Sequence, residues 1–119
     1  MTPVLSRRYA AVVSDRGAER SGGCLCGSVT YVATGPFGEI LQCHCRNCRR
    51  LSGNFVAATR TDTDAVAITD LRRTFRWHDL GYAKYGFCSS CGSTLFYRAA
   101  DRPQLTSIMV GTLEDASGL

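Results

Sequence analysis

The stretch GGCLCGSVTY, residues 22–31, combines a pair of cysteines with the beginning of an alternating apolar pattern. Cys24 and Cys26 are separated by one residue, and the glycine after them permits the tight turn that two ligands of one metal ion require. From Ser28 onward, polar and apolar residues alternate with a period close to two, as in a half-buried β-strand. The stretch therefore predicts a metal-binding turn that leads directly into a strand.

Similar β-prone runs, each bounded by turn-forming residues, recur roughly every ten residues through the rest of the chain. This spacing of short strands predicts an all-β fold. One stretch, CRNCRRLSG at residues 45–53, favours a turn or two of helix that ends at Gly53. The runs expected to form strands are GSVTYVATG (27–35), NFVAATR (54–60), AVAIT (65–69), RTFRWH (73–78), STLFYR (93–98) and QLTSIMVGTL (104–113).

The length and composition fit one globular domain. The chain has 119 residues, of which 45% are apolar and 20% charged, and no stretch approaches the roughly 20 apolar residues of a membrane span. We expect residues 1–20 to form a mobile N-terminal extension, in which residues 10–13 could add an edge strand. Residues 21–119 are expected to form the folded domain, which at this size gains stability from a structural metal or from disulfides.

The N-terminal sequence and the charge bear on compartment and partners. The first twenty residues lack the apolar run of a secretory signal peptide, so the reducing cytoplasm is the expected location, where clustered cysteines act mostly as metal ligands or catalytic groups. The formal charge of +4 counts all seven cysteines as neutral. Seven thiolates on two zinc ions would reduce it to about +1, because they add seven negative charges against four positive ones. The compositional case for nucleic-acid binding then largely disappears.

Three clusters contain all seven cysteines of the chain. Two of them, Cys24 with Cys26 and Cys88 with Cys91, are pairs that can each hold one side of a zinc ion. Two such pairs complete a tetrahedron, so we predict a closed structural zinc site of four thiolates, although either pair could instead join the middle cluster. A site of this kind contributes several kcal/mol to folding.

The middle cluster, CHCRNC at residues 43–48, supplies the three thiolates of Cys43, Cys45 and Cys48. Three protein ligands with one exchangeable position are typical of a catalytic zinc, and we take these three cysteines, hereafter the trio, as catalytic metal ligands. A thiol that binds at the open position would lose its proton and become a nucleophile held in place.

Three alternatives to the open site remain. His44 could act as a fourth ligand, although its position between two cysteines would strain the chelate. A residue from elsewhere in the chain, such as His78 or Asp79, could close the site instead. The cysteines could also bind no metal, and remain free thiols or act in redox chemistry.

Arg46, Arg49 and Arg50 surround the trio in the sequence. Their guanidinium groups could offset the negative charge of the thiolates or remain solvated. They could also bind an anionic ligand, because guanidinium groups match the geometry of carboxylates. We name them as candidate cofactor-binding residues. Most aromatic side chains are expected in the core, but Trp77 or Tyr85 could line a small ligand pocket near the trio.

Four motifs in order identify a family resemblance that covers roughly residues 22–115. They are GGCLCGSVTY (22–31), QCHCRNCRRLSG (42–53), FCSSCGSTLF (87–96) and VGTLED (110–115). With these motifs the chain resembles the glutathione-dependent formaldehyde-activating enzymes and the related centromere protein V domains. Because the match rests on four motifs with consistent order and spacing, it is more specific than any single pair of cysteines.

The resemblance implies a β-tent of packed antiparallel sheets that carries two zinc ions. It implies that Cys24, Cys26, Cys88 and Cys91 hold the structural zinc, and that the trio holds a second zinc where the glutathione thiol binds. The reaction it implies, of the carbon–sulfur lyase class, joins glutathione to formaldehyde and forms S-(hydroxymethyl)glutathione. Two departures are the N-terminal extension and the end of the chain after GTLED, so a C-terminal segment is expected to be missing.

We therefore expect a zinc-dependent enzyme in which glutathione, or another low-molecular-weight thiol, attacks a small aldehyde beside the trio. The expected partners are this thiol and the aldehyde, with no membrane and no nucleic acid, and a homodimer is left open. The alternative is a zinc-stabilised binding module, or a thiol–aldehyde carrier without turnover. Thiol binding that disappears when Cys45 is replaced distinguishes the enzyme from the binding module.

Overall fold

The computed structural model describes residues 18–119, which contain two antiparallel sheets and one short α-helix. The smaller sheet has the strand order β1 (Arg20–Gly23), β2 (Val29–Ala33), β5 (Val66–Asp70). The larger sheet has the order β3 (Leu41–Cys43), β4 (Val56–Asp62), β9 (Leu105–Met109), β8 (Thr94–Ala99), β7 (Ala83–Cys88), β6 (Phe75–Asp79). The helical segments are α2 (Arg46–Ser52) and the 3₁₀ turns η2 (Thr63–Ala65) and η3 (Val110–Thr112).

The prediction of an all-β fold of packed antiparallel sheets is confirmed. The six predicted runs correspond to β2, β4, β5, β6, β8 and β9, and the predicted helical turn is α2. Strands β1, β3 and β7 were not predicted. The edge strand suggested at residues 10–13 lies outside the described residues, as does most of the expected extension, and β1 already begins at Arg20.

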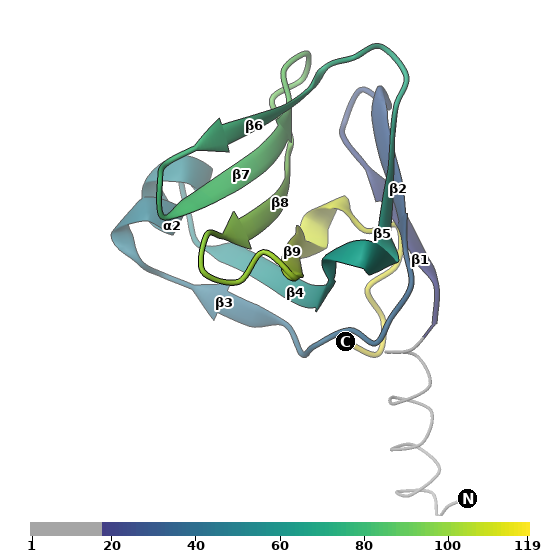
Figure 1. The fold of residues 1–119 in the computed structure, drawn as a ribbon, viewed down its shortest axis with the longest axis horizontal. Helices are drawn as coiled ribbons and strands as arrows, with labels where there is room; N and C mark the ends of the chain where they lie inside the picture. Colours follow the sequence, from purple (N-terminus) through teal and green to yellow (C-terminus); the bar gives the residue numbers. More distant parts are fainter. Residues whose placement is uncertain (1–17) are drawn as a thin grey trace, which may run out of the picture.

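The hydrophobic core lies where the two sheets pack against each other, with β2 and β5 on one side and β7 and β8 on the other (Figure 1). Tyr31 of β2 packs edge-on against Phe96 of β8, with ring centroids 5.0 Å apart. Leu95 and Ile108 are fully buried in the same cluster. The alternation that predicted β2 therefore has a physical basis, since its buried face is the one that meets the larger sheet.

The last residues of the chain pack along β1. A bridge joins Gly22 to Leu113, and the N–H of Glu114 donates to the carbonyl of Ser21 (2.9 Å). Gly22 is required here, because a β-carbon at this position would collide with the Tyr31 hydroxyl and the backbone of the C-terminal segment. The N-terminal strand and the C-terminal segment thus stabilise one edge of the smaller sheet, whereas α2 lies at the opposite side of the molecule (Figure 1).

Candidate metal centres

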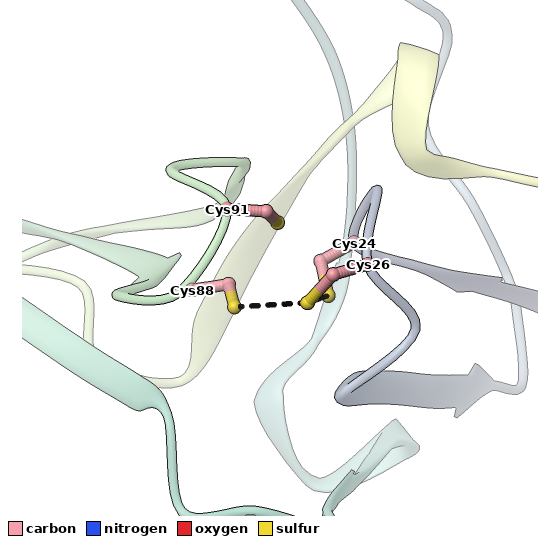
Figure 2. Close-up of side chains that lie close together, drawn as sticks. All are labelled: Cys24, Cys26, Cys88 and Cys91. Carbon is pink, nitrogen blue, oxygen red and sulfur yellow. Dashed lines mark hydrogen bonds between the residues drawn. The ribbon is translucent and has the colours of Figure 1, made fainter.

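The four cysteines predicted to form a structural site lie together. Cys24 and Cys26 lie in the turn between β1 and β2, whereas Cys88 ends β7 and Cys91 lies in the turn before β8. Their sulfur atoms lie within 4.8 Å of one another, and Figure 2 shows the side chains facing one another. The Cys24–Cys26 and Cys26–Cys88 sulfur separations are 3.6 and 3.8 Å. A tetrahedron with Zn–S distances of about 2.3 Å has S–S edges of about 3.8 Å, so this cluster fits one zinc ion.

A glycine follows each cysteine pair and shapes the turn. Gly27 and Gly92 have φ angles of +80° and +82°, in the left-handed region that residues with a β-carbon rarely adopt. The N–H of Gly27 donates to the carbonyl of Cys24 (3.2 Å), and the N–H of Gly92 donates to the carbonyl of Cys88 (2.8 Å). The first bond spans three residues and the second spans four, which matches the one-residue difference between the two cysteine spacings.

Every sulfur of this four-cysteine cluster has a hydrogen-bond donor beside it. When the sulfurs are thiolates, donors of this kind offset their negative charge and orient them toward the metal. The Ser93 hydroxyl is the main reason that the pKa of Cys91 is lowered to about 5. The donors are the Val29 N–H to Cys24 (3.3 Å), the Arg72 guanidinium to Cys26 (3.7 Å), the Thr74 hydroxyl to Cys88 (3.3 Å) and the Ser93 hydroxyl to Cys91 (3.2 Å).

The trio forms the second cluster, and its local structure follows from the start of α2. Cys43 ends β3, Cys45 is the N-cap of α2, and Cys48 lies in its first turn. The N–H of Cys48 donates to the sulfur of Cys45 (3.4 Å), and this bond is the main cause that lowers the pKa of Cys45 to about 7. Burial raises the pKa of Cys48 to about 12. The three sulfurs lie within 4.8 Å of one another, so one ion can contact all three.

His44 does not join the sulfurs of the trio. Its ring stacks on Phe55, with centroids 4.9 Å apart and an interplanar angle of 27°. In the part of the chain that the structure describes, the ligand atoms gathered at this point are the three sulfurs alone, and neither His78 nor Asp79 of β6 is among them. The geometry therefore favours a site of three thiolates over the alternatives in which a histidine or an aspartate closes it.

A cavity of about 320 Å³ opens beside the trio on one face of the larger sheet. The register pairs Cys43 with Val56 and Leu41 with Ala58, and all four side chains line the cavity. The cavity is also lined by three tyrosine rings and by Leu105, Ser107 and Met109 of β9. A volume of this size is at the lower end of the range for small-molecule sites, and the cysteines at its wall make it the candidate active site.

Two tyrosine hydroxyl groups of the cavity lining lie beside the trio or α2. The Tyr85 hydroxyl lies 3.9 Å from the sulfur of Cys48, and burial raises the pKa of Tyr85, so this hydroxyl keeps its proton. The amide of Asn47, on α2, donates to the Tyr82 hydroxyl. Tyr85 thus lines the cavity as the sequence suggested, whereas Trp77 lies outside the lining and packs under Lys84 and Arg98.

The arginines named from the sequence lie on α2 rather than in the cavity. Arg46, Arg49 and Arg50 are exposed and are not among the residues that line it, and the Nε of Arg49 donates to the carbonyl of His44 (3.2 Å). The lining instead contains Arg60 of β4 and Arg102 of the loop before β9. Sequence reasoning missed both. The alternation of NFVAATR could have indicated Arg60, since it shares one strand face with Val56 and Ala58.

Comparison with known proteins places this geometry in a family. The model of the glutathione-dependent formaldehyde-activating enzyme family matches residues 19–119. The chain belongs to this family. A crystal structure of a Rhodobacter sphaeroides protein has a similar fold, with a TM-score of 0.69 and 23% sequence identity over 82% of this chain and 90% of that chain. No curated protein matches the sequence.

Membership of the glutathione-dependent formaldehyde-activating enzymes links the chain, at the level of the family, to glutathione-dependent aldehyde activation. The matched region contains both cysteine clusters, each of which could hold a metal ion. Among residues 18–119, no helix has the length and apolar character needed to cross a membrane.

Proposed function

We propose that this protein adds glutathione, or a closely related low-molecular-weight thiol, to a small aldehyde such as formaldehyde and forms S-(hydroxymethyl)glutathione. The observation that carries the proposal is the trio at the wall of a cavity, where three sulfurs converge without a fourth ligand atom from the described residues. In this proposal the activity belongs to the carbon–sulfur lyase class, because the reverse reaction cleaves a carbon–sulfur bond. We also propose the reducing cytoplasm as its location, since the seven cysteines are all free thiols.

The donor atoms of both clusters fit zinc. Thiolate sulfur is a soft ligand that favours zinc over magnesium or calcium, which prefer oxygen, and the separations in the four-cysteine cluster match tetrahedral Zn–S geometry. We propose that Cys24, Cys26, Cys88 and Cys91 hold a structural zinc and that the trio holds a catalytic one. At the trio, a bound zinc would lower the pKa of an incoming thiol, so that the thiol is ionised at neutral pH.

The residues of the cavity then support the addition in three ways. Cys43, Cys45 and Cys48 would hold the metal at the cavity wall, and the largely apolar lining excludes water from the reacting groups. Tyr85 keeps its hydroxyl proton and can donate a hydrogen bond to the aldehyde oxygen as negative charge develops there. The thiol sulfur supplies the electron pair of the new carbon–sulfur bond, and the carbonyl oxygen takes a proton, so thiol and aldehyde combine without another reactant.

The Cys45→Ser variant tests this proposal. Serine is a good helix N-cap, so the variant preserves the start of α2 while it removes one thiolate from the trio. We expect zinc analysis to give about two ions per chain for the wild type and about one for the variant. We expect glutathione binding, measured by calorimetry, to occur in the wild type and to disappear in the variant.

The rate of S-(hydroxymethyl)glutathione formation, followed by NMR exchange measurements, completes the test. Ser90→Ala is a suitable control, because Ser90 is an exposed residue between the structural cysteines and its hydroxyl has no hydrogen bond in the described structure. Wild-type protein that holds two zinc ions but binds no thiol would contradict the proposal and favour a binding module. Thiol binding without acceleration of the addition would instead assign a carrier role.

A further inference from the structure

Two arginines line the same cavity as the trio. On β4, Val56, Ala58 and Arg60 share the face that lines the cavity, and Val56 is paired with Cys43. Four residues at about 3.3 Å each place the backbone of Arg60 about 13 Å along the strand from this pair. The cavity therefore has a sulfur-rich end and an end that contains Arg60.

Arg102 lines the cavity from the loop between β8 and β9. The backbone N–H of Arg102 donates to the carbonyl of Ala99 (3.1 Å), and the backbone carbonyl of Arg102 accepts from the N–H of Leu105 (3.1 Å). Leu105 is paired with Asp62, two residues beyond Arg60 on β4. The tight turn around Arg102 thus brings a second guanidinium to the lining of the cavity.

Within the described part of the chain, these two guanidinium groups have few carboxylates that could neutralise their charge. The structure of residues 18–119 pairs the Arg60 side chain with no carboxylate, although Asp62 follows it on the same strand face. The Nε of Arg102 lies 3.9 Å from a carboxylate oxygen of Asp101, but these side chains are 57% and 78% exposed, which makes the pair weak. The cavity lining includes no aspartate or glutamate. One end of the cavity is therefore positively charged.

We propose that Arg60, assisted by Arg102, binds a carboxylate of the thiol co-substrate and thereby selects a peptide-sized thiol over smaller ones. This inference rests on the proposed function, since it takes the sulfur of that thiol to lie at the trio. A guanidinium group matches a carboxylate with two parallel hydrogen bonds, which gives both attraction and direction. Arg60 would act as a specificity-determining residue, because it lies far from the reacting atoms.

The length of the cavity allows it to select between thiols of different size. An extended residue spans about 3.5 Å, so a tripeptide thiol such as glutathione can place a terminal carboxylate several ångströms from its central sulfur. The long side chain of Arg60 can cover the remaining distance along β4. The carboxylate of free cysteine lies too close to its sulfur to reach this end, and 2-mercaptoethanol has no carboxylate. Between the two ends, Ala58, Ser107 and Met109 offer no competing charge.

Calorimetry on the zinc-loaded full chain, with the wild type and two variants, tests the proposal. Arg60→Gln removes the charge and shortens the side chain but keeps a hydrogen-bonding group, and we expect it to weaken glutathione binding about tenfold. Its affinity for 2-mercaptoethanol should be unchanged. Arg76→Gln serves as the matched control, because Arg76 is an exposed arginine on the edge strand β6 and lies outside the cavity lining.

Several results would overturn the role of Arg60. The first is that Arg60→Gln binds glutathione as tightly as the wild type. The second is that Arg60→Gln loses affinity equally for glutathione and 2-mercaptoethanol. The third is that Arg50→Gln loses more affinity for glutathione than Arg60→Gln does, which would place the carboxylate of the thiol at α2. S-methylglutathione separates this inference from the proposed function, since its carboxylates are intact and its sulfur is blocked. If it binds as tightly as glutathione, and Arg60→Gln weakens both equally, the carboxylate site stands and thiol binding at the trio does not.

Discussion

Ser93 connects the two halves of the four-cysteine cluster, so its removal tests the structural role of that site. Its hydroxyl lies 3.2 Å from the sulfur of Cys91 and accepts a hydrogen bond from the N–H of Leu25 (2.9 Å). Leu25 lies between Cys24 and Cys26, on the other pair. The Ser93→Ala variant loses both contacts without adding bulk. It should therefore weaken metal binding and the attachment of the two turns to each other.

The size of the effect follows from the two lost bonds. A hydrogen bond to a charged acceptor contributes about 1.5–3 kcal/mol, and the Cys91 sulfur is charged when it binds metal. The Leu25 N–H is at an exposed residue, so water replaces that bond at little cost. We therefore expect the free energy of zinc binding to fall by about 2 kcal/mol, which corresponds to a roughly thirtyfold lower affinity. Losses of this order are usual when a residue that orients a metal ligand is removed.

Competition with a chromophoric chelator measures this change directly, and thermal unfolding provides an independent reading. Ser90→Ala is the matched control, since it alters the same turn but removes no hydrogen bond of the described structure. The melting temperature of Ser93→Ala should fall by several degrees, and that of Ser90→Ala should stay near the wild type. If Ser93→Ala loses zinc no more readily than Ser90→Ala, the hydroxyl does not support the metal site, and the reasoning is wrong.

Three further predictions concern the core, the cavity and the metals. Gly22→Ala should lower the free energy of unfolding in denaturant by about 3 kcal/mol, because the added methyl collides with the Tyr31 hydroxyl and with backbone; wild-type stability would contradict this. In Tyr85→Phe, the rate of thiol addition to aldehyde in excess of the uncatalysed reaction should fall about a hundredfold, while glutathione affinity is unchanged. A change in affinity alone would exclude the proposed role of the hydroxyl. Chelator titration should remove the trio's metal first without unfolding, because Cys43 and Cys45 are exposed; the metal of the four-cysteine cluster should leave later, with loss of the fold.

Among the strands found from the sequence, β2 and β5 show burial that alternates from residue to residue. In β2, the residues that alternate in the sequence also alternate between core and solvent, so the pattern was visible. β1 has the sequence RSGG, and its strand conformation depends on pairing with β2 and on space for the Tyr31 ring beside Gly22. β3 has only three residues, all exposed, and β7 contains Lys84 and Gly86 within its six residues. Tertiary contacts, rather than local preference, determine these three strands.

The cysteine clusters were predictable because metal ligands must be close in sequence to form each turn. The pairing of Cys24 and Cys26 with Cys88 and Cys91 was left open by spacing alone, and the structure brings these four together. The cavity was not predictable in the same way. Arg60 and Arg102 lie far from the trio in sequence, and only the register of β4 and β9 brings them to the same rim. Ligand groups on separate strands carry no shared local signal.

The helix α2 would make the proposed ligand site depend on a metal at the trio. Its N-cap and its first turn supply Cys45 and Cys48, and a helix of seven residues is too short to be stable by itself in water. The same helix carries Asn47, which bonds to Tyr82 across the cavity. Metal occupancy, helix formation and cavity shape are therefore linked equilibria. A thiol that fills the cavity must then raise the affinity of the trio for the metal by the same factor by which the bound metal raises the affinity of the cavity for the thiol. The supply of zinc would then regulate what fraction of the protein can bind its substrate.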